Sequence, residues 1–186
     1  MNAPAPSSAL LPDTAGLVLR PVVSGDIERE RAFIAGLSAQ SRYFRRLGAA
    51  NHQPTAERLA RLTRPIPGRE YAVAAVDDEG RGCFIGVARY ALLSMQTIGL
   101  IEAEMAAVVT DAWHRQGVGR QLVQQAIAAA GAQGIAILHG DILTGNIAGI
   151  ALARSLGFTI APHPDGASLR LASLDLRSQG TPRHPV

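Results

Sequence analysis

The chain has 186 residues, of which 47% are hydrophobic, and this length and composition suit one globular domain with its own core rather than a disordered segment. Its formal net charge is +3 and all 18 basic residues are arginine, so no lysine side chain can form a Schiff base or be acylated. The single cysteine, Cys83, excludes an internal disulfide bond and a zinc site built from several cysteines.

The sequence indicates neither a membrane span nor a secretion signal. No apolar run approaches the roughly 18 residues that a membrane-spanning helix needs, and the N-terminus lacks the charged-then-apolar order of a signal peptide. We therefore expect a cytoplasmic protein. Pro, Ser and Gly are frequent at both ends, which predicts a flexible N-terminus (1–15) and a flexible tail (177–186) around a folded domain (16–176).

The first half of the domain is predicted to hold one strand, three helices and then three strands in a row. Ser38 and Thr55 are the expected N-caps of the second and third helices, and Gly48 is the expected stop of the second. The expected helices lie at residues 26–37, 38–47 and 55–62. The expected strands lie at residues 17–22, 71–76, 83–93 and 100–109. The last three strands are joined by short turns, which predicts an antiparallel meander.

The second half alternates helices and strands. One apolar stripe marks a helix over residues 118–131, made by Val118, Leu122, Val123, Ala126 and Ile127. A buried strand is expected at 135–143, a helix from Asn146 to Gly157, and closing strands at 158–160 and 168–174. The predicted fold class is α+β, a single domain with a central mixed, mostly antiparallel sheet flanked by helices.

The stretch HRQGVGRQ, from His114 to Gln121, lies between a predicted strand and a predicted helix. Unpaired N–H groups and the helix dipole favour an anion at such a place, and glycines let the backbone approach it closely. The dinucleotide fingerprint would need a third glycine where Leu122 stands, and no P-loop lysine is present. By itself the pattern fits a plain turn before a helix as well as a phosphate site.

Three segments together carry a resemblance to a known family: EAEMAAVVTDAW, HRQGVG and NIAGIALARSLGF. They resemble the GNAT family of N-acetyltransferases, which transfer an acyl group from acyl-CoA to an amine, and the resemblance covers residues 17–175. Within the family, LRPVVSGDIERERAFIAGLSAQSRYFRRLG and AEMAAVVTDAWHRQGVG look most similar to the acetyltransferase domain of bacterial protein-lysine acetyltransferases. The resemblance implies a single GNAT-like domain that uses acetyl-CoA and no metal.

The resemblance also implies a set of residues that bind acetyl-CoA. The family's diphosphate loop falls on residues 114–119, with His114 at a position where the family has Gln or Arg. The strand before the loop is expected to pair with the pantetheine arm, and an asparagine at the start of the later helix commonly contacts the cofactor. An N-cap role is equally compatible with that asparagine. The implied cofactor-binding residues are Val108, Val109, Thr110, Arg115, Gln116, Gly117, Val118, Gly119, Arg120, Gln121 and Asn146.

Acyl transfer to an amine needs a base, because an alkyl ammonium with a pKa near 10 is protonated at neutral pH. Glu102 and Glu104 lie two apart on a strand and so share one face. A glutamate of this strand is the base in the protein-acetyltransferase branch, and Glu104 aligns with it. The family's general-acid tyrosine is absent, since Ala153 stands in the matching region, and the acid stays unassigned between Ser155 and water.

Other residue patterns leave alternatives open. His139 in an apolar strand reads as a packed or edge histidine, and Cys83 as a small core residue rather than a nucleophile. Seven arginines between Arg42 and Arg69 fit either attraction of an acidic protein surface or simple solvation of short helices.

The expected reaction is direct attack of an amine on acetyl-CoA in a ternary complex. The expected acceptor is a protein lysine, as on an acyl-CoA synthetase-like enzyme, and a small-molecule amine or a non-catalytic CoA-binding sensor are the alternatives. With aromatic content at only 4%, the sequence argues against nucleic-acid binding.

Overall fold

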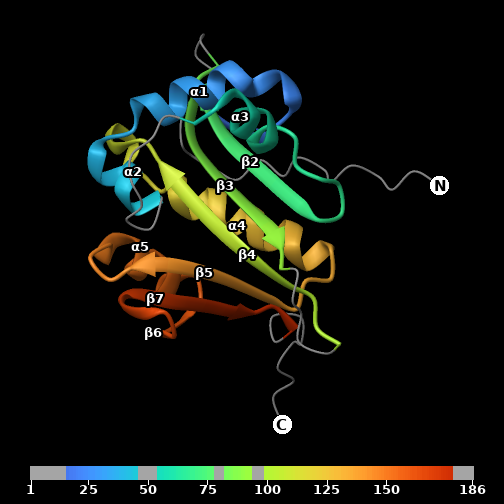
Figure 1. Ribbon diagram of the computed structural model, residues 1–186, viewed down its shortest axis with the longest axis vertical. Coiled ribbons are helices and arrows are strands. Elements are labelled where there is room, and N and C mark those ends of the chain that lie inside the picture. Colours follow the sequence, from blue (N-terminus) through green and yellow to red (C-terminus); the bar gives the residue numbers. More distant parts are fainter. Residues whose placement is uncertain (1–15, 46–53, 78–81, 94–98, 178–186) are drawn as a thin grey trace, which may run out of the picture.

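The computed structural model describes residues 16–45, 54–77, 82–93 and 99–177. Within these residues one seven-stranded sheet has the order β1-β2-β3-β4-β5-β7-β6 (Figure 1). Every neighbouring pair is antiparallel except β4 and β5, which run parallel. The predicted α+β class with a mixed, mostly antiparallel sheet is confirmed.

Every element expected from the sequence is present, with small shifts at the ends. The strands are β1 (Leu17–Pro21), β2 (Glu70–Asp77), β3 (Phe84–Leu92), β4 (Glu102–Val109), β5 (Ile137–Leu143), β6 (Thr159–His163) and β7 (Gly166–Asp175). The helices are α1 (Ile27–Gly36), α2 (Ala39–Arg45), α3 (Ala56–Leu62), α4 (Val118–Ala132) and α5 (Ile147–Ser155), with 3₁₀ turns η1 (Ser24–Asp26) and η2 (Asp111–Trp113). The expected flexible ends and the expected stop at Gly48 lie outside the described residues.

Local sequence signals set the helix starts. The Thr55 hydroxyl accepts the Arg58 N–H at 3.2 Å and the Ser38 hydroxyl accepts the Ser41 N–H at 3.1 Å, so both predicted N-caps are confirmed. β6 runs past its expected end at Ile160 because it forms a hairpin with β7.

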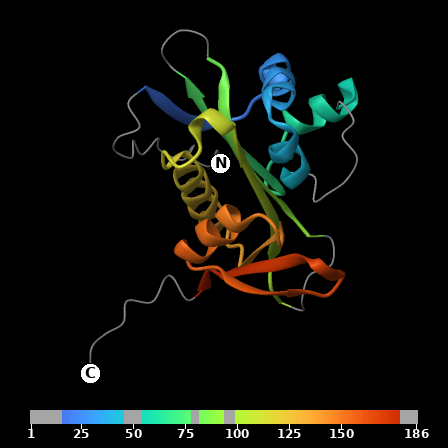
Figure 2. The same cartoon turned by 90° about the vertical axis from the view of Figure 1, so that its left-hand side faces the viewer.

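Helices cover both faces of the sheet and create two cores. Figure 2 shows α4 and α5 on one side of the strands and α1, α2 and α3 on the other. The α4 stripe, centred on the fully buried Leu122, packs against β2, β3 and β4. Phe33 of α1 and Leu59 of α3 pack on the opposite face. Because β2 and β3 are covered on both faces, they are apolar along almost their whole length.

Candidate active site

The parallel strands β4 and β5 pair over only part of their length. Their register has three positions, and the last is Glu104 opposite His139. β4 nevertheless continues to Val109 and β5 to Leu143. Among the described residues no pairing joins the two strands beyond this point, so an opening forms between their C-terminal halves.

Alternate residues of β4 turn their backbone groups to this opening. Thr110 donates its N–H to the Ile85 carbonyl of β3, and Val108, two residues earlier, faces β3 in the same way. Ala107 and Val109 therefore face the β5 side. Of the three backbone positions singled out in the sequence, only Val109 presents its N–H to the opening. An extended ligand can add to such a strand through main-chain hydrogen bonds.

The connection from β4 to α4 ends in a helix start with no capping side chain. Arg115 and Gly117 both have positive φ, at 61° and 85°, and the non-glycine Arg115 carries conformational strain there. Gly117 is the N-cap, and no side chain bonds to the first turn. The first helical bond runs from Gln121 N–H to Gly117 C=O, which leaves the N–H groups of residues 118–120 at the positive end of the helix. This arrangement suits a phosphate group.

Gly119 lies where three elements meet. A β-carbon built on it would be 3.4 Å from Leu152 of α5 and 3.6 Å from Val109 of β4. The next residue, Arg120, donates a 2.8 Å hydrogen bond to the Ser155 hydroxyl. The fold thus brings the end of β4, the start of α4 and one side of α5 together around the opening.

Three further predicted residues have local partners. Asn146 caps α5, because its Oδ1 accepts the Gly149 N–H at 3.0 Å. His114 Nε2 lies 3.0 Å from the Val109 carbonyl oxygen, and the Gln116 amide donates to Ala112 C=O at 2.8 Å. The last two contacts hold the loop against the end of β4.

Asp111 joins this loop to the helices on the other side of the strand. Its carboxylate accepts hydrogen bonds from the Ser38 hydroxyl at 2.8 Å, the Ser38 N–H at 3.2 Å and the Ser41 hydroxyl at 3.1 Å. Burial opposes ionisation of Asp111, but these hydrogen bonds outweigh it and the pKa lies below its usual range. The start of α2 is thereby tied to η2.

A cavity of about 290 Å³, here named the α3 cavity, lies between α3 and strands β2–β4. Glu104 lines it and is exposed. The α3 wall carries Arg58 and Arg61, and the strand wall carries Glu70 and Arg89. The predicted base therefore faces a hollow large enough for a side chain or a small molecule.

Most charges around the α3 cavity are paired. Arg61 forms an ion pair with Glu70, and this guanidinium holds the pKa of the Glu70 carboxyl below its usual range. Arg89 is paired with Glu30 of α1. Among the described residues, the side chains of Arg58 and Glu104 have no hydrogen-bond or ion-pair partner.

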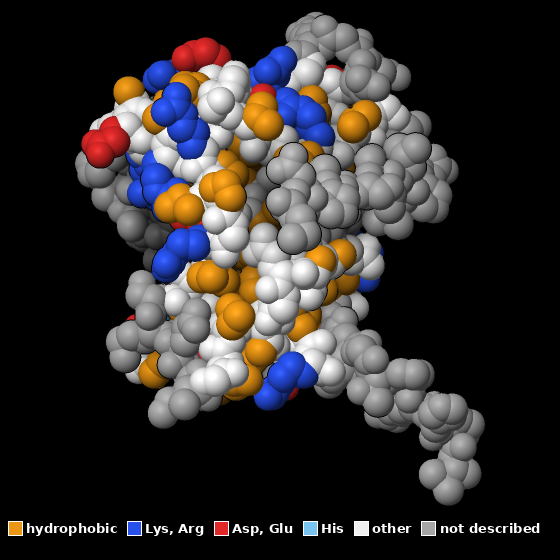
Figure 3. Space-filling model, turned by 90° about the vertical axis from the view of Figure 1, so that its right-hand side faces the viewer, with side chains coloured by type: hydrophobic (Ala, Val, Ile, Leu, Met, Phe, Trp, Pro, Cys, Tyr) orange, Lys and Arg blue, Asp and Glu red, His pale blue; other side chains and the backbone are white. Residues whose placement is uncertain are grey.

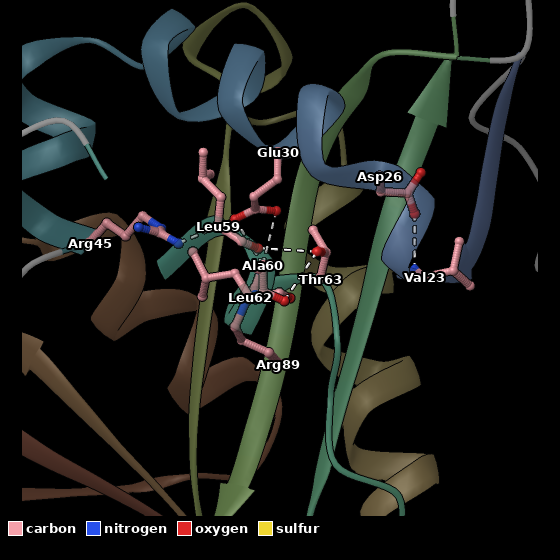
Figure 4. A network of polar contacts seen from close by, with 9 residues as sticks. All are labelled: Val23, Asp26, Glu30, Arg45, Leu59, Ala60, Leu62, Thr63 and Arg89. Carbon is pink, nitrogen blue, oxygen red and sulfur yellow. Dashed lines mark hydrogen bonds and ion pairs between the residues drawn. The ribbon is translucent and has the colours of Figure 1, made fainter. Parts of the chain in front are cut away.

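Glu30 is the centre of a buried network beneath this cavity (Figure 4). It is fully buried, and both its oxygens accept from Arg89 Nη2 at 3.0 Å, with Arg45 at 3.5 Å. Arg89 Nη1 also donates to the Leu62 carbonyl at 2.9 Å. Burial lowers the pKa of the Arg89 guanidinium, and Glu30 opposes that shift. The network fixes Arg89 in the cavity wall and links α1, α2 and α3 to β3.

Glu102 and Glu104 share a face, as predicted, but their surroundings differ. Glu102 is 9% exposed, and its Oε2 lies 3.0 Å from His139 Nε2. His139 Nδ1 in turn lies 3.1 Å from the Ser173 hydroxyl. In the tautomer that carries the ring proton on Nε2, His139 donates to the Glu102 carboxylate and its Nδ1 accepts from Ser173. Glu102 is therefore engaged, whereas Glu104 is open to the α3 cavity.

One sequence expectation is wrong. Cys83 was predicted to be a small core residue, but its side chain is exposed, because β3 begins one residue later, at Phe84. Cys83 lines a separate cavity of about 460 Å³ together with Phe33 and Thr110. His163 ends β6 and lies 3.2 Å from Asp141.

Several functional candidates had no clear signal in the sequence. Arg58 is one of seven similar arginines, and the Asp111–Ser38 contact joins residues 73 positions apart. Arginine side chains gather over the upper part of the face in Figure 3, the half of the molecule that carries the N-terminal helices. In the described part of the chain no helix is long and apolar enough to span a membrane. Those same residues contain no group of three or more His, Cys, Asp or Glu placed to hold a metal.

Known proteins match both the sequence and the fold. A family model described as an acetyltransferase (GNAT) domain matches residues 16–159. A curated protein of Pseudomonas aeruginosa, named as an acetyltransferase, is 27% identical over 158 residues, which are 85% of this chain and 83% of that protein.

Solved structures give the same picture. The GNAT domain of S. lividans PAT matches with a TM-score of 0.77 at 26% identity, over 86% of this chain and 90% of that one. The Salmonella typhimurium protein yncA, solved with its cofactor acetyl-CoA, matches with a TM-score of 0.65 over 92% of this chain and 98% of that one. At 21% identity the second likeness concerns the fold alone.

Proposed function

The chain belongs to the acetyltransferase (GNAT) domain family and is an N-acetyltransferase, and from this premise we propose that it transfers an acetyl group from acetyl-CoA to the ε-amine of a protein lysine. The observation that carries the proposal is the opening between β4 and β5 beside an uncapped helix start, with Glu104 at the edge of that opening.

The chain's own groups fit acetyl-CoA. The free N–H groups of residues 118–120, at the positive end of α4, would bind the diphosphate. Arg115 and Arg120 add positive charge beside it. The backbone of Ala107 and Val109 would pair with the pantetheine arm, and the Val109 N–H is the donor best placed to polarise the thioester carbonyl.

Glu104 is the proposed general base. When bound, acetyl-CoA supplies the acyl carbon that the amine attacks, and its thiolate leaves. A lysine ammonium must first lose a proton, and Glu104 receives it directly or through one water. Glu104 fits this role because its carboxylate has no competing partner among the described residues, whereas Glu102 is bonded to His139. The Ser155 hydroxyl already donates its proton to the Leu152 carbonyl at 2.7 Å, so water is the better source of a proton for the thiolate.

Two features support a protein acceptor. The sequence resembles the acetyltransferase domain of bacterial protein-lysine acetyltransferases. In addition, Arg61 and Arg89 are paired with carboxylates, and the charges of the α3 cavity that have no partner among the described residues are Glu104 and Arg58, so the second ammonium of a polyamine would meet the like charge of Arg58. A partner resembling an acyl-CoA synthetase follows from that resemblance.

Steady-state kinetics of Glu104→Gln test the proposal. The substitution keeps shape and polarity but removes basicity, so kcat should fall by roughly 10² to 10⁴ while acetyl-CoA affinity stays near wild type. Glu102→Gln is the matched control and should change kcat by only a few fold, because a Gln oxygen can still accept from His139. Acetylated lysines should be found by incubating a cell lysate with labelled acetyl-CoA and the enzyme.

The alternatives predict different results. A Cys83 nucleophile would give ping-pong kinetics, a labelled acyl-enzyme and an inactive Cys83→Ala variant. A CoA-binding sensor would bind acetyl-CoA but acetylate nothing. Near-normal turnover of Glu104→Gln would remove the assignment of the base.

A further inference from the structure

Two opposite charges in the α3 cavity have no described partner within the protein. Arg61 forms an ion pair with Glu70, and Arg89 donates through Nη2 to both oxygens of Glu30. This leaves Arg58 on the α3 wall and Glu104 on the strand wall. The cavity thus offers one cationic and one anionic group to whatever occupies it.

The two groups are suited to two different parts of one acceptor. Glu104 attracts the ammonium that is to be acetylated, and the Arg58 guanidinium is shaped for bidentate binding of a carboxylate. Arg58 and Glu104 line the same cavity of about 290 Å³, so an acidic side chain at Arg58 and a lysine at Glu104 would share one hollow of side-chain size. We therefore expect the acidic residue to lie near the acetylated lysine in the sequence.

Building on the proposed function, we infer that the enzyme selects lysines with an acidic residue within two positions, and that Arg58 is the residue that recognises the acidic side chain. Arg58 makes this contact without first breaking an ion pair with a described residue. Arg61 and Arg89 would each have to give up a carboxylate partner, and for Arg89 that would leave Glu30 buried without its main partner.

Short peptides with a single lysine test the inference. One set carries Asp at one of the positions −2 to +2, and a matched set carries Asn there. For wild type, kcat/KM should be about three- to tenfold higher for the best Asp peptide than for its Asn partner, mainly through KM. Arg58→Gln should abolish this preference, so that the Asp and Asn peptides are acetylated with equal kcat/KM. Arg58→Glu should transfer the preference to a peptide with Arg in place of Asp.

Arg64→Gln is the control, because Arg64 is an exposed residue just past α3 that does not line the cavity. It should retain the preference for Asp. Equal rates for Asp and Asn peptides in wild type, or an unchanged preference in Arg58→Gln, would overturn this inference alone. Failure to acetylate any peptide while acetyl-CoA binds tightly would instead overturn the proposed protein acceptor.

Discussion

Replacing Arg89 by methionine removes the main partner of a fully buried carboxylate. Arg89 donates to both oxygens of Glu30 at 3.0 Å and to the Leu62 carbonyl at 2.9 Å. After Arg89→Met, Arg45 at 3.5 Å is the one cationic partner of Glu30 that remains among the described residues. Leaving a buried charge without its partner costs about 3–5 kcal/mol of unfolding free energy. For a domain of this size that corresponds to a fall in Tm of roughly 6–20 °C.

Urea denaturation of four proteins provides the assay: wild type, Arg89→Met, Glu30→Met and the double variant. The double variant should recover much of the stability lost by either single variant, because an apolar pair of similar size needs no partners. The slope of the unfolding free energy against urea should stay constant, so that midpoints can be compared. A loss below about 1 kcal/mol in Arg89→Met, or simple additivity in the double variant, would refute the reasoning.

Three further predictions concern the phosphate loop, the Asp111 contact and a buried tyrosine. Gly119→Glu should abolish acetyl-CoA binding in a folded protein, because the added side chain meets Leu152 and its charge repels the diphosphate; calorimetry showing unchanged affinity would contradict the loop assignment. Asp111→Asn should lower the unfolding free energy by no more than about 1 kcal/mol at pH 7. The difference should begin to shrink as the pH falls below about 4 and should vanish once the pH is below the depressed pKa of Asp111, because only the ionised carboxylate gains stability from these hydrogen bonds. The Tyr90 hydroxyl is buried without a hydrogen-bond partner in the described part of the chain. Its burial, with a smaller contribution from the nearby Tyr71, raises the pKa of Tyr90 to about 12. Tyr90→Phe should therefore leave the unfolding free energy unchanged or raise it by up to about 1 kcal/mol, and a clear loss in chemical denaturation would disprove the missing partner.

Local signals were enough to predict the elements of this protein. The Thr55 cap, the apolar stripe around Leu122 and the glycine at 117 act within one or two turns of chain, so they are legible in the sequence. The order of strands and helices then indicated the α+β class, and the spaced motifs around Gly117 and Asn146 indicated the family. The opening between β4 and β5 could not be predicted in this way. Predicting it would have required the pairing register of these two strands, which α4 separates in the sequence.

The choice between similar residues depended on contacts over long sequence distances. Glu102 and Glu104 look alike in the sequence. They differ in the structure because His139, on another strand, forms a hydrogen bond with Glu102. Arg58 stands apart from Arg61 and Arg89 because no carboxylate of the described residues pairs with it. Pairing, burial and free charge are properties of side chains brought together by folding, so only the tertiary structure decides which carboxylate is free to act as a base and which arginine is free to bind an acceptor.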